Sequence, residues 1–551
     1  MKFMRFAQNK IESLGHGLFG FISNNAFLDN PTFRGLRRSL LECYDELYIL
    51  NLHGNTRKKE KTPEGSKDEN VFNIKQGVSI NLFVKNQQIP KQKIHYCDVY
   101  GERAEKYAFL AQNDLDSIEW LELTPRKPFY SLLPLETRLL DEYEQGFSVK
   151  DMFQISSVGI VTGKDRIFIA NNTESLKEQV LKYCNEFNDQ YIKDIHYRPF
   201  DIRKVYYDTK KLERARENTF KHMLPPPTNP KTPNQTRKNA ALNTPRQLKN
   251  NDKSWTQCFI SSHINDQGLS SGGNGAGVNY PLYQFNNPNY TENFTPEFRS
   301  FIDKLYNHSF EPLEILGYIY ALLYSPNYRK RYEDFLKADY PKILFTENKD
   351  LFRVLSLLGI ELIGLHVLNQ ESLDYSFEKL KDATIGESRY KSTEAHERNP
   401  IIRKPSHNTP EQRLYINHSA YFRGVSEEIY DYRIGGYCVL DKYLKDHKNE
   451  PCDFDHVTNI IKVIARTIGI QKTLGFLTND LPHLKGNGSK ALMQEILQNP
   501  PPPFNTNTAL ILSRQAKAIG DFNAAFISKE ASDLNIFSGG GGVVFPLFCI
   551  T

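Results

Sequence analysis

Basic and aromatic residues alternate in the segment YRPFDIRKVYYDTK at residues 197–210. Arginine and lysine can neutralise phosphate groups, and a tyrosine ring can stack on a base. The period of two predicts a pair of short β-strands, in which alternate residues from Arg198 to Ile202 share one face and those from Arg203 to Tyr207 the other. A half-buried hairpin with a solvated basic face fits the same pattern. The residues that could contact DNA here are Arg198, Arg203, Lys204, Tyr206 and Tyr207.

The same segment carries carboxylates that could hold a metal ion. Asp201, followed by Asp208 and Lys210, mimics a pattern of metal-dependent nucleases. In such sites the carboxylates bind Mg²⁺ and the lysine polarises the phosphate. A metal-dependent nuclease that uses these three residues is therefore an alternative function.

A second cationic turn lies in GIVTGKDRI at residues 159–167. Lys164 and Arg166 could touch phosphate at its tip, although an ordinary hairpin turn between two short strands explains the pattern somewhat better. A proline-rich stretch at 223–254 predicts a polar surface loop. Its basic residues could add salt-dependent affinity for a nucleic acid backbone or serve only solubility; they are Lys231, Arg237, Lys238, Arg246 and Lys249.

The elements that must position these residues change in character along the chain. Helical and strand patterns alternate over residues 1–115, with buried strands expected near 17–23, 47–54, 76–86 and 93–101. This order predicts the second half of a doubly wound α/β sheet, closed by a hairpin of the last two strands. A mixed α+β region follows at 116–291, and amphipathic helices dominate 292–480.

The C-terminal region, 481–551, repeats part of the middle region. FISKEASDLNIFSGG at 526–540 echoes FISSHINDQGLSSGG at 259–273, within a longer match to residues 240–285. Two copies are too few for a solenoid. A duplicated recognition segment explains them better.

The overall composition excludes several classes of protein. Because 70 basic residues face 65 acidic ones, any nucleic-acid-binding surface must be local. The seven cysteines form no CxxC pair, so we expect neither a zinc site nor a disulfide framework. Scattered cysteines of this kind favour reduced thiols in a cytoplasmic protein. No apolar run approaches the ~18 residues of a membrane span, so we expect no membrane partner.

The order of these segments resembles type ISP and type IIG restriction-modification enzymes. Residues 1–112 resemble the C-terminal half of the adenine-N6 DNA methyltransferase domain, through GLFGFISNNAFLDNPTFRGLRRSLLECYDELYILNLHGN, DENVFNIKQGVSINLFVK and VYGERAEKYAFL. Residues 116–480 resemble the target-recognition domain that follows it. The matching strings there are GIVTGKDRIFI, YRPFDIRKVYYD, YIYALLYSPNYRKRYEDFLKADYPKI, LFRVLSLLGIELIGLH and IGGYCVLDKYLKD.

The resemblance implies double-stranded DNA as partner and an incomplete Rossmann-like methyltransferase sheet. The intact family transfers a methyl group from S-adenosylmethionine to adenine N6 and needs Mg²⁺ for cleavage. The family's cofactor loop and its Asn-Pro-Pro-Tyr motif for the flipped adenine do not occur in this sequence. We therefore expect no cofactor in this chain and no catalysis by it alone. Asn24 and Asn25 follow the first strand and would border the active-site crevice.

Two further expectations concern the rest of such an enzyme. The upstream half of the methyltransferase could be a separate chain that joins this one. Alternatively, the chain is a decayed gene fragment, whose half sheet would leave an unpaired edge and an exposed apolar face.

Overall fold

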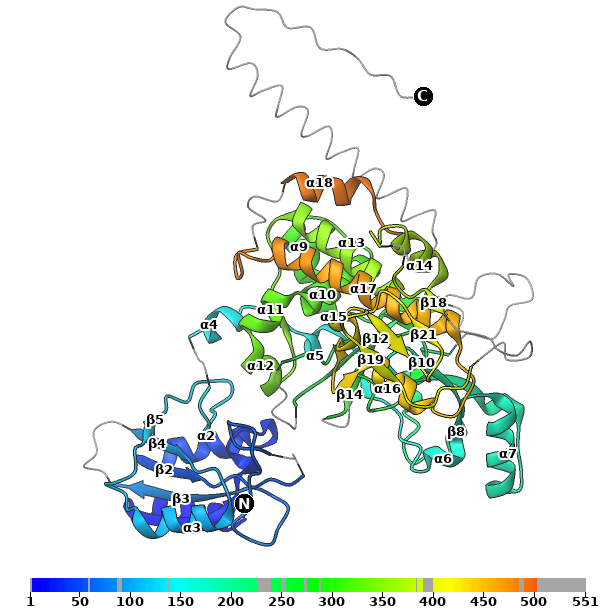
Figure 1. The fold of residues 1–551 in the computed structure, drawn as a ribbon. Coiled ribbons are helices and arrows are strands. Elements are labelled where there is room, and N and C mark those ends of the chain that lie inside the picture. The colour runs from blue at the N-terminus through cyan, green and yellow to red at the C-terminus, as the bar shows by residue number, and fades with distance from the viewer. Residues whose placement is uncertain are drawn as a thin grey trace, which may run out of the picture.

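The computed structural model describes residues 2–502, apart from 58–59, 87–91, 136–137, 225–238, 249–253, 272–274, 287–288, 383, 390–399 and 485–489. Figure 1 shows a small N-terminal body (blue) beside a larger one that holds most of the chain. The repeat at 526–540 and most of the proline-rich stretch lie outside the described residues. The chain is a mixed α/β protein with several sheets.

The N-terminal body is built on a five-stranded sheet of order β1-β3-β2-β4-β5. Its elements are α1 (Lys2–Leu14), β1 (Gly17–Asn24), η1 (Asn25–Phe27), η2 (Pro31–Phe33), α2 (Arg34–Cys43), β2 (Glu46–Asn51), β3 (Val78–Lys85), β4 (Lys93–Asp98), α3 (Arg103–Gln112) and β5 (Leu121–Glu122). The four strands expected from the apolar runs are confirmed. Because β5 pairs with β4, the sheet extends beyond residue 115.

The expected closing hairpin of β3 and β4 is wrong. β3 lies between β1 and β2 and is antiparallel to both, whereas β4 runs parallel to β2 on the other side. The apolar patterns of β3 and β4 are similar, and neither shows which neighbour a strand will take. As a result β1, β2 and β4 point the same way, and their carboxyl ends share one edge of the sheet.

Strand β1 forms an outer edge of this sheet, with β3 as its one neighbour among the described strands. Leu18 and Ile22 on its outward face are 64% and 49% exposed, and Phe3 and Phe6 of α1 are 71% and 65% exposed. Among the described residues, this edge of the sheet therefore has no paired strand and lies beside exposed apolar side chains.

Arginines connect the N-terminal body to the larger one. Arg37 of α2 is fully buried and donates from Nη2 to the carbonyl oxygen of Phe129 at 2.7 Å. Burial lowers the pKa of Arg37 to about 10, although the nearby negative charge of Asp29 acts to raise it. Arg34 pairs with Asp339 of the larger body at 2.6 Å.

Two four-stranded sheets carry the middle region, with orders β13-β9-β10-β8 and β12-β11-β14-β7. The elements from residue 140 to 292 are α4 (Leu140–Tyr143), β6 (Phe147–Ser148), α5 (Val149–Met152), β7 (Ser157–Val158), α6 (Asp165–Phe168), β8 (Ile169–Ala170), α7 (Thr173–Cys184), η3 (Asp189–Tyr191), β9 (Ile192–Arg198), β10 (Asp201–Tyr206), α8 (Glu217–Phe220), β11 (Ala241–Pro245), β12 (Phe259–Ser261), β13 (Ile264–Asn265), β14 (Gly277–Pro281), β15 (Tyr283–Asn286) and β16 (Asn289–Glu292).

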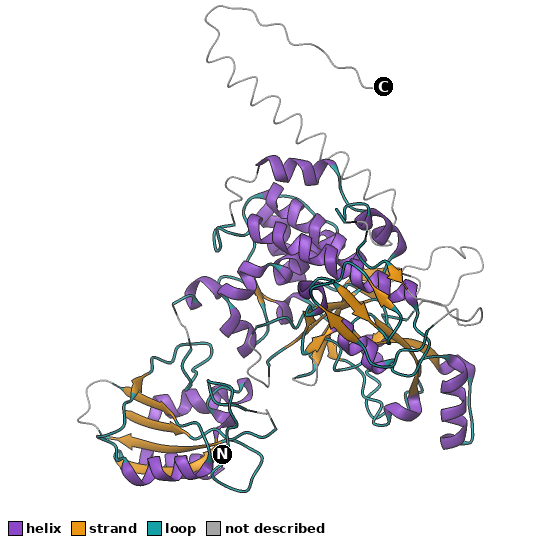
Figure 2. Ribbon diagram, viewed as in Figure 1, coloured by secondary structure: helices purple, strands orange, loops and turns teal. Residues whose placement is uncertain are grey.

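The helical region follows, and Figure 2 shows its helices gathered above the strands of the larger body. Its elements are α9 (Pro296–Tyr306), α10 (Pro312–Tyr324), α11 (Pro326–Arg331), α12 (Glu333–Ala338), β17 (Lys342–Ile343), α13 (Lys349–His366), α14 (Gln370–Phe377), β18 (Ser388–Arg389), β19 (Ser406–Asn408), β20 (Arg413–Tyr415), β21 (Tyr421–Phe422), α15 (Glu427–Tyr430), β22 (Arg433–Ile434), β23 (Tyr437–Cys438), α16 (Val439–Asp446), α17 (Phe454–Leu477) and α18 (Lys490–Gln498).

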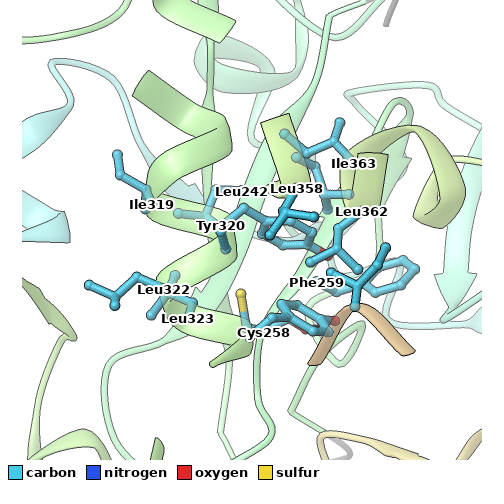
Figure 3. Packing of buried hydrophobic residues seen from close by; sticks show 14 of the residues in the cluster. Leu242, Cys258, Phe259, Ile319, Tyr320, Leu322, Leu323, Leu358, Leu362 and Ile363 are labelled. Atoms are coloured by element: carbon cyan, nitrogen blue, oxygen red, sulfur yellow. Dashed lines mark hydrogen bonds between the residues drawn. The ribbon is translucent and has the colours of Figure 1, made fainter. Parts of the chain in front are cut away.

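Helices α10 and α13 cross in close contact at two glycines. A Cβ atom on Gly359 would lie 1.8 Å from the carbonyl oxygen of Gly317, so neither position has room for a side chain. Figure 3 shows Tyr320 of α10 and Leu362 of α13 packed with Phe259 of β12. The hydrophobic core thus runs across the predicted boundary between residues 291 and 292.

None of the described helices alone has the length and apolar composition of a membrane span. Helices α13 and α14 meet those two criteria only as a pair bent by 115°.

Candidate nucleic-acid interface

Strands β9 and β10 form the hairpin expected from the basic and aromatic alternation. Arg198 pairs with Asp201 across a two-residue turn, and a β-bulge follows between Asp201 and Ile202. Phe200 occupies the turn at φ 63° with its ring fully buried, whereas Ile202 is 36% exposed. Phe200 and Ile202 therefore do not share a face as predicted, because the turn and the bulge interrupt the alternation.

Arg198 lies against the loop after β13. Its Nη1 donates to Oδ1 of Asp266 at 2.7 Å, and its side chain is 17% exposed. The guanidinium stacks over the Tyr197 ring, with Cζ 3.9 Å from the ring centroid. Burial raises the pKa of Asp266, and the charge of Arg198 works against that shift. Arg198 therefore fixes the position of the hairpin.

Arg203 pairs with a carboxylate of its own strand. Its Nε and Nη2 donate to Oδ2 of Asp201 at 2.9 and 2.6 Å. Asp201 is 2% exposed and lies 3.3 Å from Nε2 of His447, whose Nδ1 is 2.8 Å from Oε2 of Glu450. Burial opposes ionisation of Asp201, but His447 and Arg203 outweigh it and lower its pKa to about 2.

Lys204 is the one hairpin cation of this set with substantial exposure. Its side chain is 36% exposed and its Nζ lies 2.5 Å from Oδ1 of Asp194. A surface pair of this kind contributes only about 0–1 kcal/mol, so a phosphate can compete for the lysine.

Tyr206 and Tyr207 lie in the core of the middle region. Their exposed fractions are 1% and 6%, and both belong to the cluster that includes Val205 and Leu176. The Tyr206 hydroxyl accepts a hydrogen bond from the backbone N–H of Asn188 at 3.2 Å. Since neither ring reaches the surface, the structure argues against the predicted direct contact with DNA.

The cationic turn opens a one-turn helix, α6, and does not connect two paired strands as expected. Thr162 explains the difference, because its hydroxyl accepts from the N–H of Lys164 at 3.2 Å and donates to the Asp165 carboxylate. Lys164 and Arg166 are both exposed. Lys164 lies over the Tyr183 ring at 4.4 Å, whereas Arg166 has no carboxylate partner among the described residues. A hollow of about 510 Å³ lies beside this tip, between Arg166 and Asp266.

The tip and the hairpin are in contact. Tyr197 of β9 donates from its hydroxyl to Oδ2 of Asp165 at 3.3 Å. Lys164, Arg166 and Lys204 are thus the predicted cations that the structure leaves on the surface of this region.

The proposed nuclease site is wrong. Asp201 begins β10 and Asp208 lies beyond its end. The five residue steps of the strand, at ~3.3 Å each, already place roughly 16 Å between its two ends. Carboxylates that share a Mg²⁺ ion each lie ~2.1 Å from it. Asp208 instead accepts from the backbone N–H of Lys210 at 3.0 Å. Within the described residues, no group of three or more His, Cys, Asp or Glu side chains could hold a metal ion.

Asn24 and Asn25 lie at the carboxyl edge of the N-terminal sheet, and their place beside an active site stays a prediction. Asn24 caps η1 by accepting from the N–H of Ala26 at 2.8 Å, and Asn25 donates to Oδ1 of Asn51 at 3.0 Å. Near them His53 is held between Glu60 at 2.9 Å and Asp98 at 2.6 Å. Burial works against protonation of His53, yet these two carboxylates raise its pKa.

Comparison with known families decides the class of this region. The family model of the Type ISP C-terminal specificity domain matches residues 184–474, which include the β9–β10 hairpin and most of the helical region. The chain belongs to this family.

Solved structures similar to the chain share its fold at 20% identity. One is a nuclease-deletion mutant of the Type ISP restriction-modification enzyme LlaGI with a DNA substrate mimic (TM-score 0.61, 87% of this chain, 47% of that chain). Another is the DrdV–DNA complex, with a TM-score of 0.62 over 87% of this chain and 52% of that chain. A third is the ATP-dependent Type ISP restriction-modification enzyme LlaBIII bound to DNA, with a TM-score of 0.62 over 86% of this chain and 33% of that chain.

The chain spans about half or less of the length of these three structures. No curated protein matches it.

Sequence reasoning missed the residues that hold the arginines of the specificity domain in place. Asp266 lies 68 positions from Arg198, and His447 lies 246 positions from Asp201. Tyr437 also stacks near Arg198, at 5.5 Å. No local pattern connects positions so far apart, so only the three-dimensional structure could identify them.

Proposed function

We propose that this chain is the DNA sequence-recognition portion of a restriction-modification enzyme and binds double-stranded DNA in the cytoplasm. The observation that carries this proposal is the family match over residues 184–474. The similar structures are DNA complexes, which supports the same partner for this chain. The exposed cations Lys164, Arg166 and Lys204 supply charge for phosphate contacts.

The N-terminal body contributes to a methyltransferase domain under this proposal. Its sheet order and the shared carboxyl edge of β1, β2 and β4 are compatible with half of a Rossmann-like sheet. The intact enzyme would transfer a methyl group from S-adenosylmethionine to adenine N6 and use Mg²⁺ for cleavage. Asn24 and Asn25 would border its active site, and this chain would not catalyse either reaction alone.

The open edge of β1 is where the remaining half of the sheet would pair. Its backbone groups are unpaired on one side among the described strands, and Leu18 and Ile22 are exposed beside them. An added strand would satisfy the backbone and cover these side chains. That strand would come from further methyltransferase sequence, on the same polypeptide or on a separate chain.

Titration of a fluorescent duplex with the purified chain tests DNA binding. We expect binding at 50 mM salt that weakens steeply towards 200 mM. Lys164→Ala, Arg166→Ala and Lys204→Ala should each weaken it, whereas Lys330→Ala on α11 removes an exposed charge elsewhere and should not. Absence of duplex binding at 50 mM salt would contradict the proposal.

A further inference from the structure

A second basic surface lies far along the chain from the cationic tip. It consists of Arg403, Lys404, His418 and Lys448, and we call it the 403–448 surface. Two adjoining hollows of about 490 and 480 Å³ share Arg403 and Lys404 in their walls. Ser406, Tyr415 and Asn417 complete the first, and Ile401, Lys448 and Asn449 the second.

The two hollows contain no acidic side chain in their lining. The hollows beside the cationic tip differ, because one is lined by Asp165 and Asp266 and the other by Glu213. Cations, hydroxyls and amides without carboxylates favour an anion over a cation or a neutral ligand.

The positive charges of this surface are not neutralised by described carboxylates. Arg403, Lys404 and Lys448 are exposed, and none lies within 4.0 Å of a described Asp or Glu oxygen. Asp446, two positions before Lys448, pairs with Lys442 at 2.5 Å. Glu450 lies two positions after Lys448. Its carboxylate is taken by Asn171 at 2.5 Å and His447 at 2.8 Å.

The backbone beneath these side chains is anchored. Ile402 exchanges hydrogen bonds with the 449–450 turn, donating to the Glu450 oxygen at 3.0 Å and accepting from Asn449 at 2.8 Å. Arg403 donates from its N–H to the Ile416 oxygen at 3.0 Å. Ile402 and Ile416 are 1% and 0% exposed. The charges therefore project from a fixed platform.

The platform is also connected to the recognition hairpin. Asn171, directly after β8, donates to Glu450, and His447 contacts Asp201 of β10. The β8–β10 sheet and the 403–448 surface thus share a hydrogen-bonded network, so a ligand that spans both would meet them in a fixed relative position.

We propose that the 403–448 surface binds the sugar–phosphate backbone of the DNA whose bases the specificity domain reads. The inference rests on the proposed function and adds to it a site that positions DNA without reading it. Arg403, Lys404 and Lys448 supply the charge, and Ser406 supplies a neutral donor. Contacts to phosphate set the register of a protein on a duplex and carry no base preference of their own.

The test compares the triple variant Arg403→Ala/Lys404→Ala/Lys448→Ala with the unaltered chain by fluorescence anisotropy on two duplexes, one with the preferred sequence and one scrambled. Removing three phosphate contacts should lower the slope of log K against log salt by about 2–3. Affinity at 150 mM salt should fall by roughly 10- to 100-fold, equally for both duplexes.

The matched control is Lys304→Ala/Lys330→Ala/Lys381→Ala, which removes three exposed charges from the helical region. It should leave the slope within about 1 of the original. Circular dichroism and thermal melting of both triple variants confirm that the fold is retained. Arg403→Gln/Lys404→Gln/Lys448→Gln provides a second version should the alanine variant fail to fold.

The possible outcomes separate this inference from the proposed function. An unchanged slope and affinity in the triple variant, with normal binding by the original chain, overturns the 403–448 surface alone. Loss of affinity confined to the preferred duplex also overturns it, because that result indicates base reading. Failure of the unaltered chain to bind either duplex overturns both.

Discussion

Arg198 and Asp266 form an ion pair of 2.7 Å that ties the β9–β10 hairpin to the loop after β13. Both side chains are largely buried, with exposed fractions of 17% and 12%. The ion pair gives Arg198, which the sequence presents as a DNA contact, a structural role in the specificity domain.

Replacing Arg198 should destabilise the protein more than it alters DNA contacts. Arg198→Met leaves the Asp266 carboxylate buried without its partner, and we expect a loss of about 3 kcal/mol in unfolding free energy. Chemical denaturation measures this loss. Arg198→Met/Asp266→Asn should recover a large part of it, and an Arg198→Met variant with unchanged stability but weaker DNA binding would contradict the structural role.

Replacing Tyr206 should likewise lower the stability of the protein, because its side chain packs in the core. Tyr206→Ala should cost about 3–5 kcal/mol of unfolding free energy because it empties a buried ring site. Tyr206→Phe keeps the ring and should cost about 1 kcal/mol for the lost acceptor. If Tyr206→Phe abolished duplex binding while stability was unchanged, the hydroxyl would have to contact DNA.

The contact of His447 with Asp201 should make stability depend on pH. Burial alone would lower the pKa of His447, but Asp201 and Glu450 raise it above 6.5. A histidine whose pKa is higher in the folded than in the unfolded protein stabilises the fold. This stabilisation is complete below the pKa of the unfolded state, and it is lost as the pH rises through the pKa of the folded state. The pKa of Asp201 is lowered from 3.8 to about 2. The ionised carboxylate therefore stabilises the folded protein above pH 3.8, and this stabilisation is lost as the pH falls towards 2.

The pair should therefore stabilise most between about pH 4 and 6.5. Denaturation of the original chain and of His447→Gln at pH 5.5 and 8.5 tests this window. We expect the difference between the two proteins to be larger at pH 5.5. An equal difference at both pH values would show that His447 does not gain a proton from this environment.

The crossing of α10 and α13 should tolerate no side chain at Gly359. Gly359→Ala places a methyl group against the Gly317 carbonyl and should abolish the cooperative thermal transition or prevent soluble expression. Gly475→Ala is the matched control on α17, since its nearest outside atom is 4.0 Å away. That change should stabilise by up to about 1 kcal/mol through helix propensity. Normal melting of Gly359→Ala would refute the close crossing.

The open edge of β1 should govern self-association. Leu18→Lys/Ile22→Lys places charges on the exposed face and should shift the isolated chain towards monomer in sedimentation, with little change in melting temperature. Phe301→Lys, at a 38% exposed position on α9, is the control. Aggregation of all variants without a cooperative melt would favour the decayed-fragment hypothesis.

The sequence predicts elements better than neighbours in this protein. The runs that become β1, β2, β3 and β4 are short, apolar and bounded by polar turns, so their existence follows from local pattern. The insertion of β3 between β1 and β2 does not, because pairing depends on the whole sheet. Tyr206 illustrates the same limit. The alternation predicts which residues share a face of the strand with Tyr206, but it does not predict which of the two faces packs against the core.

Charge partners were the least predictable part of the site. Arg198 and Arg203 look available in the sequence because their carboxylates are brought to them by tertiary folding or by the bulge after the turn. Lys164 and Arg166 stay exposed because Thr162 and Asp165 start a helix and leave the turn at the surface.

Selection from a random duplex pool tests the central claim most directly. The chain, alone and together with the remaining methyltransferase sequence, is incubated with the pool near 100 mM salt, and bound duplexes are sequenced over several rounds. The account predicts enrichment of one defined sequence, retained in the Lys330→Ala control. Lys164→Ala/Arg166→Ala should enrich the same sequence but bind less of the pool in total, because phosphate contacts carry no base preference. Bound duplexes with no enriched sequence under either condition would contradict it.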